Sequence, residues 1–399
     1  MHEVLTSGFI FPNEKHVLWT LMIVLYPYIT GLVAGAFIVS SLYHLFGKHE
    51  LKPVGRLSLV ISFCFLLFAC IPLLVHLGHP ERAFNIMVTP NLTSAMSGFG
   101  FIYMFYMLIV ALEIWFIFRE DIVEAYHKAI YDYDSNDIRI WIYYLLSLGV
   151  TEVTPKSKEI DHKISKILAG IGIPSACVLH GYVGFIFGAL KSNPWWSTPL
   201  MPVIFLMSAI VSGIAALIIL YMIIMWIEKK PVDIPCIRVM ATYLWGFLLI
   251  DITLELLELL VMGYESLESW PIISALITQK LGLSLIGFQF IICTAIPLIL
   301  LATIILFKLK DQTIKSFAFL SAILLILQVL AMRWNVVIGG QLFSKSFRGL
   351  NDFTPLFFER EGIIPAIIIF SMPFVVYYVA TKILPKIMPD SNEKELGEI

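Results

Sequence analysis

A series of long apolar runs constrains this chain more than any other feature of its sequence. The runs lie at roughly 17–45, 56–78, 97–118, 165–190, 200–227, 236–262, 281–307, 314–334 and 362–384. A helix of about 20 apolar residues crosses the hydrocarbon core of a bilayer. Inside lipid, backbone polar groups must bond to one another, which a helix achieves within one segment. We therefore expect an all-α, polytopic membrane protein with about nine transmembrane helices.

Composition excludes several other classes of protein. Of the 399 residues, 59% are hydrophobic and only 14% are charged, too little polar surface to cover a water-soluble globule. A net charge of −2 does not favour nucleic acid as a partner. The five cysteines form no CxxC pair, so we expect no iron–sulfur cluster or zinc site within this chain. A redox metal centre would then belong to a partner subunit.

The distribution of basic residues predicts the orientation. Of the 27 Lys and Arg residues, 19 lie in segments on one side of the predicted helices and 8 on the other. Because cytoplasmic loops are enriched in Lys and Arg, the N-terminus should be outside and the C-terminus in the cytoplasm. The 8 outer-side residues in this count include Arg333.

We expect a single integral membrane domain over residues 1–390, followed by a polar tail at 391–399. A polar cytoplasmic loop is predicted at 119–164 and an outer loop at 335–361. Within the first loop, the apolar stretch 138–150 is too short to span and favours an interfacial helix. Trp195, Trp196 and Trp270 lie at outer ends of runs, where they are either membrane-interface anchors or walls of a ligand site.

Three carboxylates interrupt the sixth run. Asp251, Glu255 and Glu258 are spaced four and then three residues apart, which places them on one face of a helix. An acid near the bilayer centre costs about 2.5–3.5 kcal/mol on insertion scales, so such residues usually serve a proton path, an ion site or a polar ligand. The alternative is a structural hydrogen bond between helices.

Counting residues from the outer ends of the runs brings several polar side chains to similar depths. His180 and Asp251 lie at nearly the same level, with Tyr182 and Glu255 slightly closer to the outer face. His76 lies almost at the outer mouth. These positions predict a polar pocket in the outer half of the membrane, although a lone histidine in an apolar run is often a satisfied structural residue.

Quinone chemistry suits such a pocket. A quinone head group needs hydrogen-bond partners at its carbonyls and exchanges two protons per turnover, which a His, a Tyr and a chain of carboxylates can supply. Haem ligation by His76 and His180 is the rival use of these side chains. The other histidines lie at run ends or in loops and offer no second pair of ligands.

Several segments resemble one family of membrane proteins. They are HLGHPERAF at 76–84, TPNLTSAMS at 89–97, GLVAGAF at 31–37, YVGFIFGAL at 182–190 with PWWSTP and FLMS after it, and RWNVVIGGQ at 333–341. In this order they resemble the NrfD/PsrC family of polysulfide-reductase-type integral membrane subunits. Its longer members include membrane subunits of menaquinone reductase, alternative complex III and Hdr-like menaquinol oxidoreductase.

The resemblance implies NrfD/PsrC-like helical bundles in the multi-pass plasma membrane of a prokaryote. It implies a respiratory subunit, not catalytic alone, that exchanges electrons between menaquinone or a related quinone and an iron–sulfur (ferredoxin-like) or cytochrome c partner. On this resemblance Tyr182 approaches the quinone, and Asn13 with His16 matches a pair that serves there in relatives. Asp251 and Glu255 resemble positions proposed for proton passage, and Glu258 continues their face. We expect no haem or iron–sulfur cluster in this chain.

A different class of function stays open. A proton- or cation-coupled transporter would also place acids in mid-membrane, but it would move a solute without a redox partner. The sequence leaves open the terminal electron donor or acceptor, the direction of electron flow and the coupling to proton movement.

Overall fold

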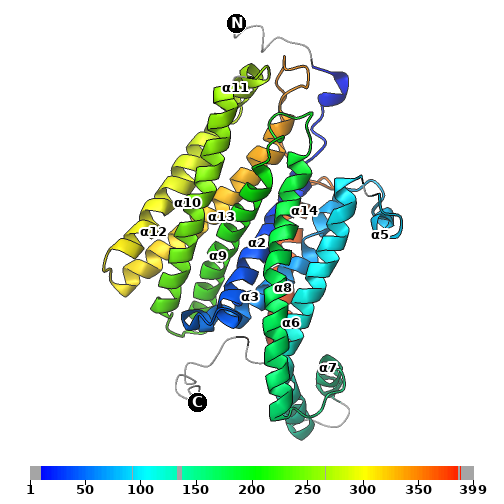
Figure 1. Ribbon diagram of the computed structural model, residues 1–399, viewed down its shortest axis with the longest axis vertical. Helices are drawn as coiled ribbons and strands as arrows, with labels where there is room; N and C mark the ends of the chain where they lie inside the picture. The colour runs from blue at the N-terminus through cyan, green and yellow to red at the C-terminus, as the bar shows by residue number, and fades with distance from the viewer. Residues whose placement is uncertain (1–9, 92, 133–136, 266, 385–386, 388–399) are drawn as a thin grey trace.

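The structure is a computed structural model that describes residues 10–91, 93–132, 137–265, 267–384 and 387. The described chain is all-α (Figure 1), and the predicted tail at 391–399 lies outside it. The longer helices are α2 (Leu21–His44), α3 (Lys52–Phe68), α6 (Ala95–Asp132), α8 (Pro155–Gly188), α9 (Met201–Ile227), α10 (Ile234–Glu265), α12 (Ile296–Leu306), α13 (Asp311–Val337) and α14 (Ile363–Ile383). The shorter ones are α4 (Ile71–His76), α5 (Asn85–Val88), α7 (Ile138–Leu146), α11 (Trp270–Gln279) and the π-helix η4 (Gly282–Ala295).

The predicted apolar runs correspond to these helices. Within the described residues, eight segments are long and apolar enough to cross a membrane, which makes the protein a polytopic membrane protein. The predicted run 236–262 forms α10, which is not one of the eight but packs lengthwise against α9, α12 and α13. A count of nine spans and an outer N-terminus stay predictions. The outer end of the bundle is the end that carries Thr20, before α2, and Trp270, at the start of α11.

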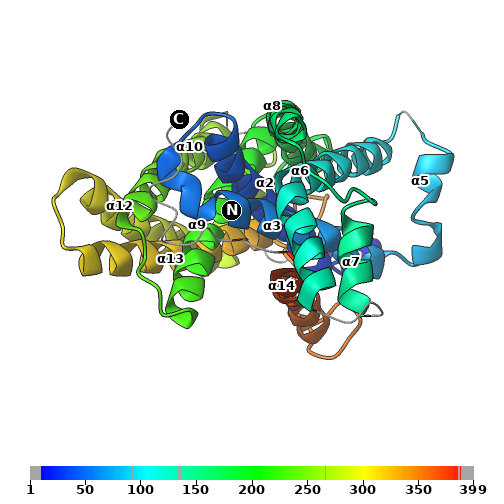
Figure 2. The same ribbon diagram turned by 90° about the horizontal axis from the view of Figure 1, so that it is seen from below.

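The helices form two neighbouring bundles that share a central helix. The first bundle contains α2, α3, α6 and α8, and the second contains α9, α10, η4 with α12, and α13. Helix α2 also packs against α9 and α13, so it lies between the bundles and is almost entirely buried (Figure 2). Helix α14 packs against α3 and α2 from outside.

Two glycines permit the close approach of α2 and α9. A Cβ atom built on Gly35 would lie 2.6 Å from the Cα of Gly213. A Cβ atom on Gly213 would lie 2.4 Å from the Cα of Gly35. Small residues at such a crossing let two backbones come into direct contact, as they commonly do between membrane helices.

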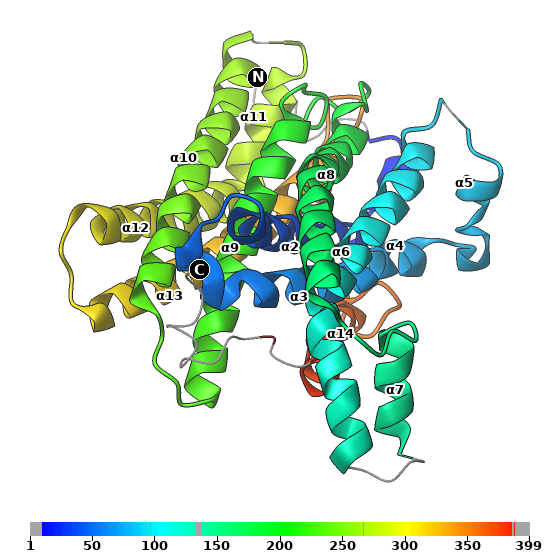
Figure 3. The same ribbon diagram turned by 60° about the horizontal axis from the view of Figure 1, so that its bottom comes forward.

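The segment predicted as a polar loop at 119–164 is largely helical. Helix α6 continues to Asp132, and α8 begins at Pro155, so both helices extend beyond the body of the bundle (Figure 3). A short helix, α7, forms inside the apolar stretch 138–150, and Asp137 caps its start by accepting a hydrogen bond from the backbone N–H of Arg139. Trp141 and Leu145 of α7 are exposed, which suits the predicted interfacial helix.

Candidate functional site

Helix α10 turns two of its three predicted acids into the interior of the second bundle. Asp251 is completely buried and Glu255 is 6% exposed, while Glu258 lies one turn closer to the outer end. The predicted face of acids therefore points toward protein, where α13 packs against α10 and Gln289 of η4 reaches Glu255.

Amide side chains from two neighbouring helices hold Glu255. Gln289 of η4 donates from Nε2 to Oε2 of Glu255 at 2.7 Å, and Gln328 of α13 donates from Nε2 to Oε1 at 3.3 Å. Both glutamines are buried. A buried carboxyl group needs such partners, because an unbonded polar group in an apolar interior is costly.

The π-helix makes this arrangement possible. Asn335 of α13 donates from Nδ2 to Oε1 of Gln289 at 2.8 Å, and its Oδ1 accepts from the hydroxyl of Ser284 at 2.8 Å. Ser284 and Gln289 are five residues apart. In a π-helix, where hydrogen bonds run from i to i+5, residues five apart lie on nearly the same face, whereas in an α-helix they diverge. One asparagine can thus bind both.

A small cavity lies beside Glu255 and Glu258. It has a volume of about 40 Å³, and Gln289, Asn335 and Trp195 also line it. A water molecule needs about 10–15 Å³ on this measure, so the cavity has room for a few waters at most. It suits proton transfer between carboxyl groups and is too small for a quinone ring.

Arg333 is the main member of this interior that sequence reasoning missed. The sequence places it on the outer face, but its side chain is 1% exposed inside α13. Its Nη2 donates to the hydroxyl of Ser208 at 2.8 Å and to the carbonyl of Phe205 at 3.2 Å, both on α9. The guanidinium lies 3.8 Å from the centroid of the Phe205 ring, a cation–π contact. If Arg333 is left out of the basic residues counted on the outer side, the predicted orientation of the helices is unchanged.

Neutral groups thus hold Arg333, while its charge acts on the acids through space. The nearest acids on which this charge acts are Asp251 and Glu255. Both carboxyl oxygens of Asp251 lack a hydrogen-bond partner among the described residues. One cation balances one carboxylate, and an additional buried acid is accommodated at lower cost when it carries its proton. The cluster therefore combines one buried cation with two buried acids.

His180 lies in the first bundle near the boundary with the second. It is 2% exposed, its Nε2 has no hydrogen-bond partner among the described residues, and the charge of Arg333 acts on it. The imidazole therefore points into protein and not into lipid.

Tyr182 points to a different neighbour. Its hydroxyl donates to the carbonyl of Ala95 at 2.7 Å, and its ring approaches Gly98, both at the start of α6. His180 and Tyr182 are two residues apart, so they lie on different faces of α8. No hydrogen bond joins them in the described chain.

The remaining predicted contacts lie at the outer end. Nδ1 of His76 is 2.9 Å from Oε2 of Glu361, which also accepts a hydrogen bond from the hydroxyl of Thr20. Asn13 and His16 are exposed, and neither side chain bonds to another described residue. The structure therefore distributes the predicted quinone contacts over three places.

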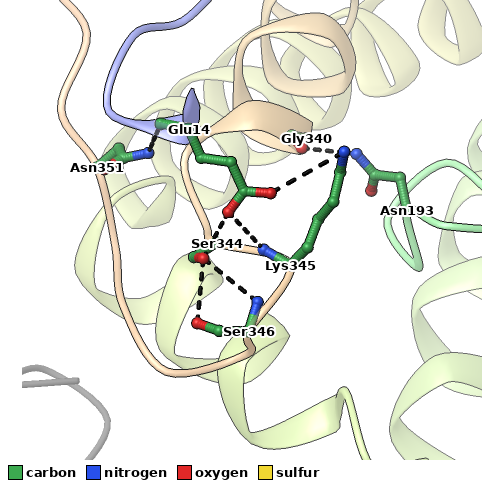
Figure 4. A network of polar contacts seen from close by, with 7 residues as sticks. All are labelled: Glu14, Asn193, Gly340, Ser344, Lys345, Ser346 and Asn351. Atoms are coloured by element: carbon green, nitrogen blue, oxygen red, sulfur yellow. Dashed lines mark hydrogen bonds and ion pairs between the residues drawn. The ribbon is translucent and has the colours of Figure 1, made fainter. Parts of the chain in front are cut away.

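The segment around Asn13 is fixed by its neighbour Glu14. Oε2 of Glu14 accepts from the hydroxyl of Ser344 at 2.5 Å and from the backbone N–H of Lys345 at 3.0 Å (Figure 4). Its backbone carbonyl accepts from Nδ2 of Asn351 at 2.5 Å. These contacts tie the start of the described chain to the predicted outer loop 335–361.

Trp195 and Trp196 lie above the acid cluster and not at an open membrane boundary. Both indoles are buried. They donate hydrogen bonds from Nε1 to backbone carbonyls at the end of α13, Trp195 to that of Asn335 at 3.1 Å and Trp196 to that of Val336 at 2.7 Å. The expectation of interface anchors is therefore wrong for this pair, and Trp195 instead walls the small cavity.

A second buried charged residue that sequence reasoning missed is Glu113 of α6. It is completely buried, and neither carboxyl oxygen has a hydrogen-bond partner among the described residues. The signal was a single acid inside the apolar run 97–118. Within the described chain, no group of three His, Cys, Asp or Glu side chains comes together in a way that could hold a metal ion.

Comparison with known proteins places these features in a family context. The family model described as "Polysulphide reductase, NrfD" matches residues 11–345. A selenate reductase subunit of Mesobacillus selenatarsenatis is 32% identical over 255 residues, covering 63% of this chain and 58% of the relative. Protein NrfD of Escherichia coli is 26% identical over 218 residues, covering 54% and 62% respectively.

A further relative matches along almost the whole chain. The Hdr-like menaquinol oxidoreductase integral membrane subunit of Archaeoglobus fulgidus is 22% identical over 399 residues, covering 96% of this chain and 89% of that protein. The chain spans less than two thirds of the length of the selenate reductase and NrfD relatives.

Proposed function

The chain belongs to the NrfD polysulphide reductase family, and from this premise we propose that it is the quinone-interacting membrane subunit of a respiratory oxidoreductase complex. In this role it exchanges electrons between a menaquinone-type quinone and an iron–sulfur or cytochrome partner in a prokaryotic plasma membrane. The name of the Archaeoglobus relative, a menaquinol oxidoreductase membrane subunit, supports menaquinone as the quinone.

One observation carries this proposal above the others. Glu255 is held by two amides inside the second bundle, beside a cavity of about 40 Å³ and within reach of the charge of Arg333. A quinol that is oxidised gives up two electrons and two protons. The electrons pass to an acceptor in the partner, and the protons need acceptors inside the protein.

We assign the roles as follows. Asp251, Glu255 and Glu258 accept and pass protons, and Arg333 keeps the charge of this cluster balanced. His180 and Tyr182 are the proposed contacts to a quinone head group in the first bundle. His76, Asn13 and His16 at the outer end are further candidates.

A direct test uses the complex as it is purified. The chain is isolated with its associated subunits, and the reduction of the partner's redox centre by a short-chain menaquinol is followed anaerobically. We expect quinol-dependent reduction in the wild type and its loss when His180 is replaced by Ala, with the complex still assembled. Wild-type rates in the H180A variant would remove His180 from the site.

The rival function is tested in the same preparation. Proteoliposomes containing the chain are assayed for uptake of cations or protons without quinol and without a redox partner. Transport under those conditions, together with absent quinol oxidation, would contradict the proposal and favour a transporter.

A further inference from the structure

A groove of about 630 Å³ lies between η4 and α13, lined by residues of η4 other than those that line the small cavity. This volume is within the range of about 300–1,000 Å³ that small-molecule sites occupy. Its walls are mainly apolar, and its polar groups are few: the hydroxyl of Ser284, and the side chains of Lys280 and Asp352, which form an ion pair with an N–O distance of 2.5 Å.

The shape of the groove suits a flat ring that carries an apolar tail. Trp334 and Phe353 form an aromatic wall, with ring centroids 5.8 Å apart. Along the opposite edge, Leu283, Phe288 and Ile292 are exposed on the outside of the bundle, where a lipid-soluble tail can leave. A phospholipid head group fits less well, because the one lysine of the groove is already paired with Asp352.

The hydrogen bonds behind the groove have a fixed direction. A carboxyl oxygen of Glu255 accepts from the amide nitrogen of Gln289, which turns the oxygen of Gln289 toward Asn335. Asn335 therefore donates to Gln289 and turns its own oxygen toward Ser284. Ser284 must then donate its single hydroxyl proton to Asn335.

This direction decides what Ser284 offers to the groove. With its proton used, the hydroxyl keeps only acceptor lone pairs. A hydroxyl group of a ligand can donate to it, whereas a carbonyl would face it oxygen to oxygen. Lys280 gives one of its three N–H groups to Asp352 and can still donate to a carbonyl or to a hydroxyl oxygen, so the discrimination between the two forms rests on Ser284.

We propose that this groove is a binding site for a prenylated quinone and that it selects the reduced, hydroxyl-bearing quinol over the oxidised quinone. The inference rests on the proposed function. It adds a site in the second bundle, apart from His180 and Tyr182, and a preference for one redox state.

The experiment uses the full chain in lipid nanodiscs and an azido-naphthoquinone photoprobe with a short tail. Labelled peptides are identified by mass spectrometry, and short-chain menaquinol or menaquinone is added as competitor under anaerobic conditions. We expect label within 280–292 or 334–353. One additional hydrogen bond should let the quinol displace the probe at a concentration about fivefold lower than the quinone.

Two variants isolate the two parts of the inference. Ser284→Ala should bring the two competitors to nearly equal potency, because the acceptor is gone. Gly287→Leu should abolish label in the groove. A Cβ on Gly287 makes only ordinary contacts, 3.6 Å to Leu283 and 4.0 Å to the carbonyl of Gly282, so the fold tolerates the change. Gly246→Leu is the matched control, since nothing lies within 4 Å of a Cβ there.

The outcomes distinguish a failure of the proposed groove site from a failure of the proposed quinone-linked function. Label confined to the α6–α8 region, a co-purified phospholipid held in the groove, or equal potency of the competitors in the wild type would overturn the inference. In each of these cases quinol oxidation by the complex would still support the proposed function. Absence of label anywhere together with absent quinol oxidation would overturn both.

Discussion

The amide of Gln289 donates to Glu255 at 2.7 Å, and this one contact determines the orientation of the side chains behind it. Gln289 can accept from Asn335 only because its nitrogen is turned to the acid, and Asn335 accepts from Ser284 for the same reason. An acid on α10 thus sets the hydrogen-bond direction of a hydroxyl of η4 that lines the groove. One chain of hydrogen bonds therefore connects the acid cluster of α10 to the groove.

Replacing Glu255 by Gln should reduce quinol-dependent electron transfer by about 100-fold, the scale of a lost acid–base group. The amide keeps the size of the side chain and can still accept from Gln289, so the complex should assemble normally. Rates are measured anaerobically with short-chain menaquinol. Glu228→Gln, a partly exposed acid paired with Lys230 at the other end of α9, is the control and should retain activity. Equal rates in both variants would exclude Glu255 from proton transfer.

Arg333 and Asp251 should be energetically coupled. Arg333→Met removes the charge that acts on the buried acids and the hydrogen bonds to Ser208 and to the carbonyl of Phe205, and should lower stability by about 3 kcal/mol because the acids lose their balancing cation. Adding Asp251→Asn should recover part of this loss, with a coupling of about 0.5–3 kcal/mol for neighbouring groups. Reversible unfolding in SDS measures all four forms of the cycle. Strict additivity would show that the two charges do not interact.

A surface pair provides the comparison for that cycle. Lys158 and Glu120 form an ion pair between α8 and α6, and both side chains are about half exposed. Exposed pairs contribute about 0–1 kcal/mol, so Lys158→Met should change the unfolding free energy little. A large loss there would mean that the assay responds to charge removal in general.

Most of the fold followed from hydrophobicity, since the membrane requires each long apolar run to become a helix. The exceptions have physical causes. The polar continuation of α6 to Asp132 carries helix-forming residues but no hydrophobic signal, so hydropathy predicts a loop there. No residue composition is typical of a π-helix, so the sequence does not predict η4. Its backbone register depends on the side chains of α13 that pack against it.

The acid face of α10 was predictable because its spacing alone fixes it. Arg333 was not, because it lies at the end of the apolar run 314–334, where depth counting places a residue at the surface. Trp195 and Trp196 fold over that end of α13 and bury it, a tertiary contact between segments some 140 residues apart. The sequence also did not single out the amides Gln289, Gln328 and Asn335. Their hydrogen bonds form only between helices that are distant in the sequence.

Tyr182 and Tyr103 allow a role in quinone binding to be separated from a structural one. Both hydroxyls donate to backbone carbonyls in the first bundle, Tyr182 to Ala95 and Tyr103 to Leu66. Each Tyr→Phe change should cost about 1 kcal/mol of stability, the net value of one hydrogen bond. Only Tyr182→Phe should also raise the KM for menaquinol, severalfold. If both variants shift KM alike, or neither does, Tyr182 is a structural residue.

The crossing of α2 and α9 makes the sharpest stability prediction, since it joins the two bundles through backbone contact. A methyl group on Gly213 would lie 2.4 Å from the Cα of Gly35 and 2.7 Å from the backbone nitrogen of Ala36, which no rotamer change can relieve. Gly213→Ala should therefore lower the unfolding free energy by about 1–3 kcal/mol, the usual cost of overpacking. Gly246→Ala on α10 meets nothing within 4 Å and should be neutral or stabilising by up to about 1 kcal/mol, as helix propensity predicts. Thermal unfolding of the two variants in one detergent gives the comparison, and equal midpoints would mean that α2 and α9 are not packed in backbone contact.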